Sequence, residues 1–236
     1  NVKKKIQQMK KFFNCLKYPK YFYAYFNLIC PLFELKEPLL KIGYIKNIID
    51  VGSNKGQFSL ISRIIYPESF IYSFEPQEKY LNLQKKIFHN KIKFYNCCLG
   101  EKEYFKDLYI TQREDSSSLL EPSISENKIY KVKKKIKVKI KTLNNIFKNK
   151  KLENSLMKID VQGYEYQVLK GSSKIINKIN YLLIELSSQG IYKHQIDKYK
   201  IIEFLKTKNF KIIKKYNKSM IENNIYQHDY LFKRIC

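Results

Sequence analysis

The sequence predicts an α/β protein whose core is a doubly wound, largely parallel β-sheet. From Lys46 onward, short apolar segments alternate with longer amphipathic ones, as strands and helices do in such folds. Residues 47–51 are a short apolar run that ends in Asp50 and Gly52, and residues 181–186 are a second run, apolar but for Glu185; both are typical of parallel strands buried on both faces. Hydrophobic residues make up 44% of the 236 residues, which is enough to bury a core despite a net charge of +25.

The individual elements follow from these patterns in chain order. Strands are expected at 47–51, 70–75, 92–99, 104–111, 136–140, 156–160, 181–186, 210–216 and 230–233. Helices are expected at 56–65, 77–88, 164–169 and 197–208. Residues 136–140 alternate apolar residues with lysine, which we interpret as an edge strand.

Residues 1–40 differ in character from the rest and form a predicted helical extension, with the main domain at 41–236. Residues 2–16 place Ile6, Met9 and Phe13 at helical spacing, and an aromatic run follows at 21–26. We expect this extension to pack across one edge of the domain. The alternative is a basic, aromatic segment that lies on a membrane surface, giving a peripheral membrane contact.

Several classes of protein are disfavoured by composition. No apolar stretch approaches the roughly 20 residues that span a bilayer as a helix, and no secretory signal is recognisable. Five cysteines form no CxxC pair and no metal-ligand spacing with the three histidines, so we expect no metal site. An odd number of cysteines without a framework indicates reduced thiols and a cytoplasmic location.

The positive charge has a compositional explanation. All but three of the 46 basic residues are lysines, and alanine and tryptophan are almost or wholly absent, a bias that AT-rich codons produce. Proteins that read nucleic acids use arginine for bidentate contacts with guanine and phosphate. We therefore expect no specific nucleic-acid partner, although non-specific attraction to polyanions should be measurable.

A ligand site is predicted at the carboxyl ends of the strands, where open α/β sheets bind their ligands. The first strand leads into Asp50, Gly52, Asn54 and Gly56, a GxxxG turn without the middle glycine that accommodates a pyrophosphate. This turn favours a nucleoside over a dinucleotide. Glu75 ends the second strand, 25 residues after Asp50, where an acid can accept hydrogen bonds from ribose hydroxyls.

Three further strand ends carry candidate residues. Cys98 and Leu99 end the third, where they would flank an adenine ring. The fourth delivers Asp160 to the centre of the sheet, where a buried carboxylate needs a ligand or a partner. Glu165 is a second carboxylate, in the first turn of the following helix. It would either line the ligand site or only interact favourably with the helix dipole. The fifth strand brings Glu185 to the same edge.

Taken in order, these motifs resemble one family. They are IDVGSNKGQFS at 49–59, FEP at 74–76, LG at 99–100, SSL at 117–119, and KIDVQGYE at 158–165 with VLKG at 168–171. Over residues 42–234 the chain resembles the FkbM family of S-adenosylmethionine-dependent methyltransferases. The resemblance implies a Rossmann-like sheet with a reversed last hairpin and O-methyl transfer, often to sugars or secondary metabolites. Gln162 departs from the glutamate usual there, which weakens any case for a metal or a base at that position.

The resemblance also implies roles for individual residues. Asp50, Gly52, Asn54 and Gly56 would hold the methionine part of the cofactor, Glu75 its ribose, and Cys98 and Leu99 would lie near the adenine. Asp160 would sit where cofactor and acceptor meet, as a base or an acceptor-orienting group, and His194 is the second candidate base. Ser117, Ser118 and Glu165 would line the acceptor pocket.

The expected activity is therefore methyl transfer from S-adenosylmethionine to a hydroxyl of a glycan, a sugar or a small metabolite. An NAD-dependent oxidoreductase is an alternative that the missing middle glycine disfavours. A second alternative is a lysine-rich binding module that keeps the fold without turnover. An acceptor pocket blocked by the chain's own side chains would favour that reading.

Overall fold

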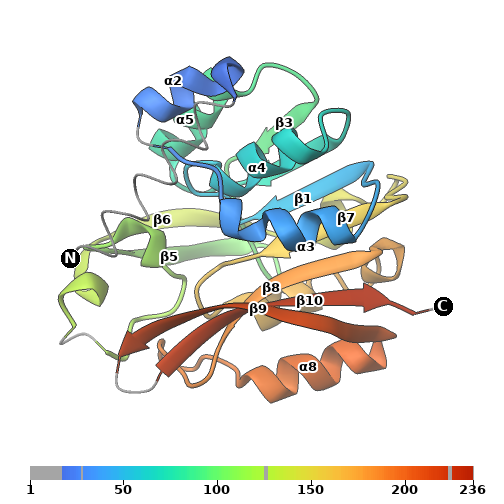
Figure 1. Cartoon of the computed structure of the whole chain (residues 1–236). Coiled ribbons are helices and arrows are strands. Elements are labelled where there is room, and N and C mark those ends of the chain that lie inside the picture. Colours follow the sequence, from blue (N-terminus) through green and yellow to red (C-terminus); the bar gives the residue numbers. More distant parts are fainter. Residues whose placement is uncertain (1–17, 28, 125–126, 223–224, 236) are drawn as a thin grey trace.

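A seven-stranded sheet forms the centre of the molecule in the computed structural model, which describes residues 18–27, 29–124, 127–222 and 225–235. Its strand order is β3-β2-β1-β7-β8-β10-β9 (Figure 1). The first five strands in this order run parallel, whereas β10 is antiparallel to both neighbours. The strands are β1 (Asn47–Val51), β2 (Phe70–Phe74), β3 (Ile92–Tyr95), β7 (Ser155–Ile159), β8 (Tyr181–Ser187), β9 (Phe210–Glu222) and β10 (Ile225–Arg234). The predicted doubly wound sheet with a reversed last hairpin is confirmed.

Helices cover both faces of this sheet because successive strand residues point to opposite sides. Ile48 and Leu156 pack against Leu39 and Phe58 on one face, whereas Ile49 packs on the other. The first face carries α3 (Lys36–Lys41) and α4 (Gln57–Ile65), with α5 (Glu78–Ile87) beside them. The second carries α6 (Leu143–Ile146), α7 (Glu165–Lys170) and α8 (Lys198–Thr207). None of the helices within the described residues is long and apolar enough to cross a bilayer.

A separate three-stranded sheet corrects two expectations. It has the order β4-β6-β5, with β4 (Cys98–Leu99), β5 (Tyr104–Thr111) and β6 (Val132–Lys141). The strand predicted at 92–99 is thus two strands in different sheets. The segment at 136–140 is the central strand of its sheet, not an edge, because its alternation reflects one buried and one solvated face. The last two strands are longer than expected and form one extended hairpin.

The described part of the N-terminal segment packs on the main domain. Ala24, within α2 (Phe22–Phe26), and Ile29 are fully buried against Leu60, Ile87 and Phe88. The helix predicted at 2–16 lies outside the described residues. The boundary placed at residue 40 falls inside α3, so the division into an extension and a domain remains a proposal.

Two glycines with nearly the same backbone conformation meet very different surroundings. Gly52 has φ +76°, and a Cβ added there would lie 2.0 Å from the backbone oxygen of Asp160. Gly43 has φ +74°, and a Cβ there would meet nothing within 4 Å. Because the left-handed conformation alone costs a non-glycine residue about 1–2 kcal/mol, any larger effect at residue 52 must come from the overlap.

We therefore predict that Gly52→Ala lowers the free energy of unfolding by about 3 kcal/mol or more, and Gly43→Ala by only about 1 kcal/mol. In thermal melts the second variant should lose about 2–4 °C and the first several times as much. Equal losses for the two variants would show that the turn after β1 does not sit tightly against Asp160.

Candidate functional site

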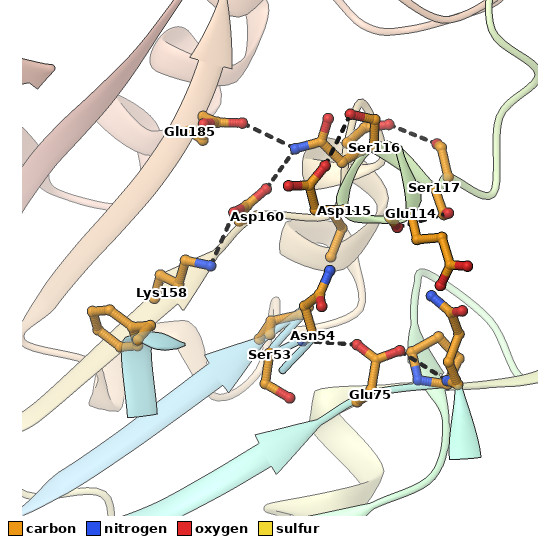
Figure 2. Close-up of a pocket in the computed structure, with 18 of the residues that line it drawn as sticks. Ser53, Asn54, Glu75, Glu114, Asp115, Ser116, Ser117, Lys158, Asp160 and Glu185 are labelled. Atoms are coloured by element: carbon orange, nitrogen blue, oxygen red, sulfur yellow. Dashed lines mark hydrogen bonds and ion pairs between the residues drawn. The ribbon is translucent and has the colours of Figure 1, made fainter. Parts of the chain in front are cut away.

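A cavity of about 400 Å³ opens at the carboxyl ends of β1, β2 and β7. This volume lies within the range of roughly 300–1,000 Å³ that is usual for ligand pockets. One end is bounded by the turn after β1 and by the residues that follow β2. The other is bounded by Asp160, Glu185 and the loop at 113–119, and Figure 2 shows both ends. The predicted position of the site therefore coincides with a cavity.

Glu75 joins the first two strands at this cavity. One of its carboxylate oxygens accepts the backbone N–H of Asn54 at 2.8 Å, and the other accepts that of Gln77 at 2.8 Å (Figure 2). The side chain lines the cavity but is only 4% exposed. Burial raises the pKa of Glu75 to about 7, although the two N–H groups act in the opposite direction. The carboxylate of Glu75 thus faces the turn after β1, as the sequence analysis predicts.

The turn after β1 is stabilised by hydrogen bonds from a polar side chain of α5. Gln84 donates to the backbone oxygen of Asn54 at 2.6 Å and to the hydroxyl of Ser53 at 2.8 Å. Asn54 itself has φ +48°, and its side-chain oxygen is buried with no hydrogen-bond partner among the described residues. Such an unpaired acceptor is costly unless a ligand or water donates to it.

Asp50 and Gly56 shape this turn without lining the cavity. Asp50 is fully buried and accepts a hydrogen bond of 2.7 Å from the Ser59 hydroxyl on α4. Burial raises the pKa of Asp50, and the nearby ammonium of Lys158 partly offsets that effect. Gly56 has φ +84°, and a Cβ there would crowd Gln84 and Phe88 at 3.0 Å. Both residues therefore fix the backbone on which the turn is built.

Cys97, Cys98 and Leu99 line the cavity next to Glu75. Burial raises the pKa of Cys97 to about 11 and that of Cys98 well above its ordinary value. Both thiols are therefore protonated at neutral pH, which suits packing rather than nucleophilic chemistry. Their backbone follows β3, whose end lies beside that of β2.

Asp160 is the centre of a charged network at the other end of the cavity. One of its carboxylate oxygens lies 3.0 Å from the ammonium of Lys158, and the other accepts from the Gln162 amide at 2.8 Å (Figure 2). The same amide nitrogen donates to Glu185 at 3.0 Å. Gln162 adopts a left-handed backbone with φ +55°, and its amide oxygen lies 3.0 Å from the Tyr192 hydroxyl. Gln162 therefore ties β7, β8 and the loop after β8 together.

The protonation states in this network follow from burial and charge. Burial alone would lower the pKa of Lys158, but the carboxylates of Asp160 and Asp50 raise it above its ordinary value. Burial and the negative charge of Asp160 raise the pKa of Glu185 well above its ordinary value. Lys158 is thus a fixed cation that balances Asp160, while burial and the charge of Asp160 favour the protonated form of Glu185.

The serine-rich loop closes the cavity opposite Glu75. Ser118 donates to the backbone oxygen of Gln162 at 2.6 Å, and Ser117 donates to the backbone oxygen of Glu114 at 2.8 Å. The Tyr192 hydroxyl lies 2.8 Å from the backbone oxygen of Ser116. Both predicted serines line the cavity, and their hydroxyls also hold the loop in place.

The structure brings most of the predicted residues together. Gly52, Asn54, Glu75, Cys98, Leu99, Ser117, Ser118 and Asp160 all line one cavity. Glu165 does not line it, since its carboxylate accepts the backbone N–H of Gly163 at 2.9 Å and holds the turn after β7. His194 is exposed on the loop after β8 and also lies outside the cavity lining.

Sequence reasoning missed Lys158 and the bridging role of Gln162. A signal for Lys158 was present, because it is a lysine that follows Leu156 and Met157 and precedes Ile159 in a strand that is buried throughout. Nothing in the sequence revealed that Gln162 reaches two carboxylates. Among the described residues, no group of histidine, cysteine, aspartate or glutamate side chains is arranged to hold a metal ion.

Comparison with known proteins gives solved structures of similar arrangement at low identity. Magnesium protoporphyrin IX methyltransferase from Synechocystis PCC 6803 is 14% identical, with 85% of this chain and 76% of that chain covered and a TM-score of 0.48. Precorrin-6y C5,15-methyltransferase from Geobacter metallireducens GS-15 is 9% identical, with 86% and 88% covered and a TM-score of 0.46. An rRNA methylase from Streptococcus thermophilus is 10% identical, with 87% and 97% covered and a TM-score of 0.46.

The family assignment rests on sequence. No curated protein sequence matches the chain. The family model of the methyltransferase FkbM domain matches residues 50–212, which is more than half of the chain and includes the turn after β1, Glu75 and the Asp160 network. The chain therefore belongs to the FkbM family of S-adenosylmethionine-dependent methyltransferases.

Proposed function

We propose that this methyltransferase acts on a hydroxyl group of a glycan, a sugar or a small metabolite. The observation that carries the proposal is the Asp160 carboxylate, which stands in the same cavity as Glu75, between the turn after β1 and the serine-rich loop. S-adenosylmethionine, when bound, supplies an electrophilic methyl group and leaves as a neutral thioether. The protein must then position the acceptor and take up the hydroxyl proton.

We propose Glu75 and the turn after β1 as the cofactor cradle. Each carboxylate oxygen of Glu75 already accepts one N–H and keeps lone-pair capacity for a ribose hydroxyl. The unpaired side-chain oxygen of Asn54 suits the ammonium group of the methionine part. Gly52 lets this turn pack directly against the backbone of Asp160, while Asp50 and Gly56 support the turn. Cys98 and Leu99 offer the wall for the adenine.

We propose Asp160 as the group that orients the acceptor and removes its proton. When the acceptor hydroxyl is methylated, its proton would pass to a carboxylate oxygen of Asp160. Lys158 and Gln162 fix that carboxylate from two sides, so it is aimed before the acceptor arrives. Ser117 and Ser118 lie at the acceptor end of the cavity. Glu165 and His194 take no part in this proposal, because neither lines the cavity.

The two alternatives receive less support. A binding module without turnover would have its acceptor space filled by its own side chains, whereas one cavity here connects Glu75 with Asp160. A dinucleotide would need room for a pyrophosphate at the first turn. Among the residues of this turn that line the cavity, only Gly52 lacks a side chain. Asn54, whose φ is +48°, follows two residues later with its side chain in place.

A peripheral membrane contact through residues 1–40 remains part of the proposal. In the described part of this segment, Phe26 is 84% exposed and lies beside Phe22, while Ala24 faces the domain. Aromatic rings on one side of a helix suit the interface of a bilayer. Sedimentation with vesicles should recover more of the native chain than of the variant F22S/F26S, which changes two exposed rings and keeps the buried Ala24 and Ile29, and equal recovery would contradict the contact.

The role of Glu75 is open to a matched test. Glu75→Ala should abolish the rise in melting temperature that S-adenosylhomocysteine causes, because the variant removes both ribose acceptors. Glu78→Ala removes an exposed carboxylate three residues away on α5 and should keep the shift. A full shift in the Glu75 variant would remove this residue from the cradle.

The pH dependence of binding follows from the raised pKa of Glu75. With the pKa at about 7, the side chain is largely protonated at pH 6 and ionised at pH 8. Only the ionised form accepts on both oxygens, so affinity for S-adenosylhomocysteine should rise about tenfold over this interval. The free energy of unfolding of the free protein changes in the opposite direction. Because burial favours the protonated form of Glu75, the stability that this form contributes is lost as pH rises through about 7. Calorimetric titration at both pH values measures the first effect, and a flat profile would contradict it.

The reaction itself can be tested with Asp160→Asn. Incubation of the native chain with methyl-labelled S-adenosylmethionine and hydroxylated acceptors should yield a labelled methoxy carbon by NMR. The variant should lose about 10²–10⁴-fold in rate while its thermal shift with S-adenosylhomocysteine is retained. Asp115→Asn, at the same cavity but outside the Lys158 network, should lose less than tenfold. Label on nitrogen or carbon, or a fully active Asp160 variant, would refute the proposal.

A further inference from the structure

The outer face of the three-stranded sheet carries a row of lysines. Val138 and Ile140 of β6 are buried, so the alternate residues Lys135, Lys137 and Lys139 point away from the core. Lys133 extends the row at the bulge opposite Ile110 and Thr111, and all four lysines are exposed. At about 3.4 Å per residue, the row is roughly 20 Å long. It is therefore longer than a single sugar ring.

The charge of this row is little compensated within its own sheet. Asp107 is the single acidic residue in β5 and β6, and it lies 4.0 Å from Lys137. The other residues of β5 on this face are aromatic. Phe105 lies opposite Lys139 and is 64% exposed, and Tyr109 lies opposite Lys135, whose ammonium is 4.7 Å from its ring centre.

The row of lysines begins at the mouth of the cavity. Lys133 lies 3.7 Å from the carboxylate of Glu114, and Glu114 lines the cavity. Lys79 and Tyr80 of α5 also contact this carboxylate. One end of the row therefore lies next to the cavity.

We propose that the outer face of β6 binds the chain of an acidic glycan, one hydroxyl of which enters the cavity to be methylated. This inference rests on the proposed function and narrows its substrate class to a polymer that carries carboxylate groups. The lysines pair with successive carboxylates, and the exposed ring of Phe105 offers a flat apolar surface to the C–H face of a sugar. Net positive charge adds long-range attraction for the same chain.

Two other polyanions fit this face less well. A membrane would be met by a broad cationic surface, but the row is one strand wide, with Phe105, Asp107 and Tyr109 beside it. A nucleic acid would be held by arginine forks, and the row contains only lysine. The proposed reaction also needs a free hydroxyl group on the acceptor, and sugar polymers have one in nearly every unit.

The test measures binding of a fluorescent oligogalacturonate to the full chain by anisotropy. The triple variant K135Q/K137Q/K139Q should weaken binding by at least about tenfold, because all three charges lie in the proposed track. The control K200Q/K206Q/K211Q removes the same charge from exposed positions on α8 and β9 that do not line the cavity, and should weaken binding less than about threefold. Neutral dextran should not bind.

Equal weakening by the two triple variants would show that only bulk charge matters and would overturn the proposal. So would an absence of binding, or tighter binding of single-stranded DNA or anionic vesicles with the same dependence on the β6 lysines. The thermal shift with S-adenosylhomocysteine is measured on every variant and should not change. Loss of that shift in the native chain would instead count against the proposed methyl transfer, independently of the binding result.

Discussion

The site depends on the interaction of the buried ammonium group of Lys158 with the carboxylates of Asp160 and Asp50. The pairing of β1 with β7 places Lys158 beside Asp50, and its ammonium lies 3.0 Å from Asp160. Removing carboxylates from water is costly unless a countercharge lies close by. Lys158 supplies that countercharge in the middle of the sheet, so an acidic cavity can form between strands that are otherwise apolar.

A second constraint fixes the two ends of the cavity relative to each other. The backbone N–H of Asp160 donates to the backbone oxygen of Val51 at 3.1 Å, and the backbone oxygen of Asp160 lies against Gly52. The turn that we propose for the cofactor therefore rests directly on the residue that we propose for the acceptor. Methyl transfer requires the reacting atoms to be in line, and two adjoining turns of one rigid sheet maintain such a relation better than mobile loops would.

Much of the central sheet was predictable because its signals are local. The strand predicted at 47–51 is β1 to the residue, because a parallel strand buried on both faces is rich in apolar residues and this one is followed directly by a glycine turn. The residues at the strand ends were predictable for the same reason, because parallel strands bring their carboxyl ends to one edge. Glu75 and Asp160 were found in this way.

The remaining features depend on contacts between distant segments. The split of 92–99 into β3 and β4 arises because Cys98 pairs with Ile140, some forty residues later. Gln162 bridges two carboxylates and a tyrosine from three parts of the chain, which no local pattern reveals. His194 was a reasonable candidate by residue type, but the path of its loop leaves it exposed outside the cavity.

The left-handed backbone of Gln162 has a consequence for any attempt to make this protein more robust. A non-glycine residue at φ +55° is strained, and glycine would relax the main chain there. The same replacement would delete the amide that bridges Asp160 and Glu185 and accepts from the Tyr192 hydroxyl. Because these hydrogen bonds would be lost and glycine has more freedom in the unfolded chain, we expect the strain to be outweighed, so a glycine here would cost heat resistance as well as the aim of the Asp160 carboxylate.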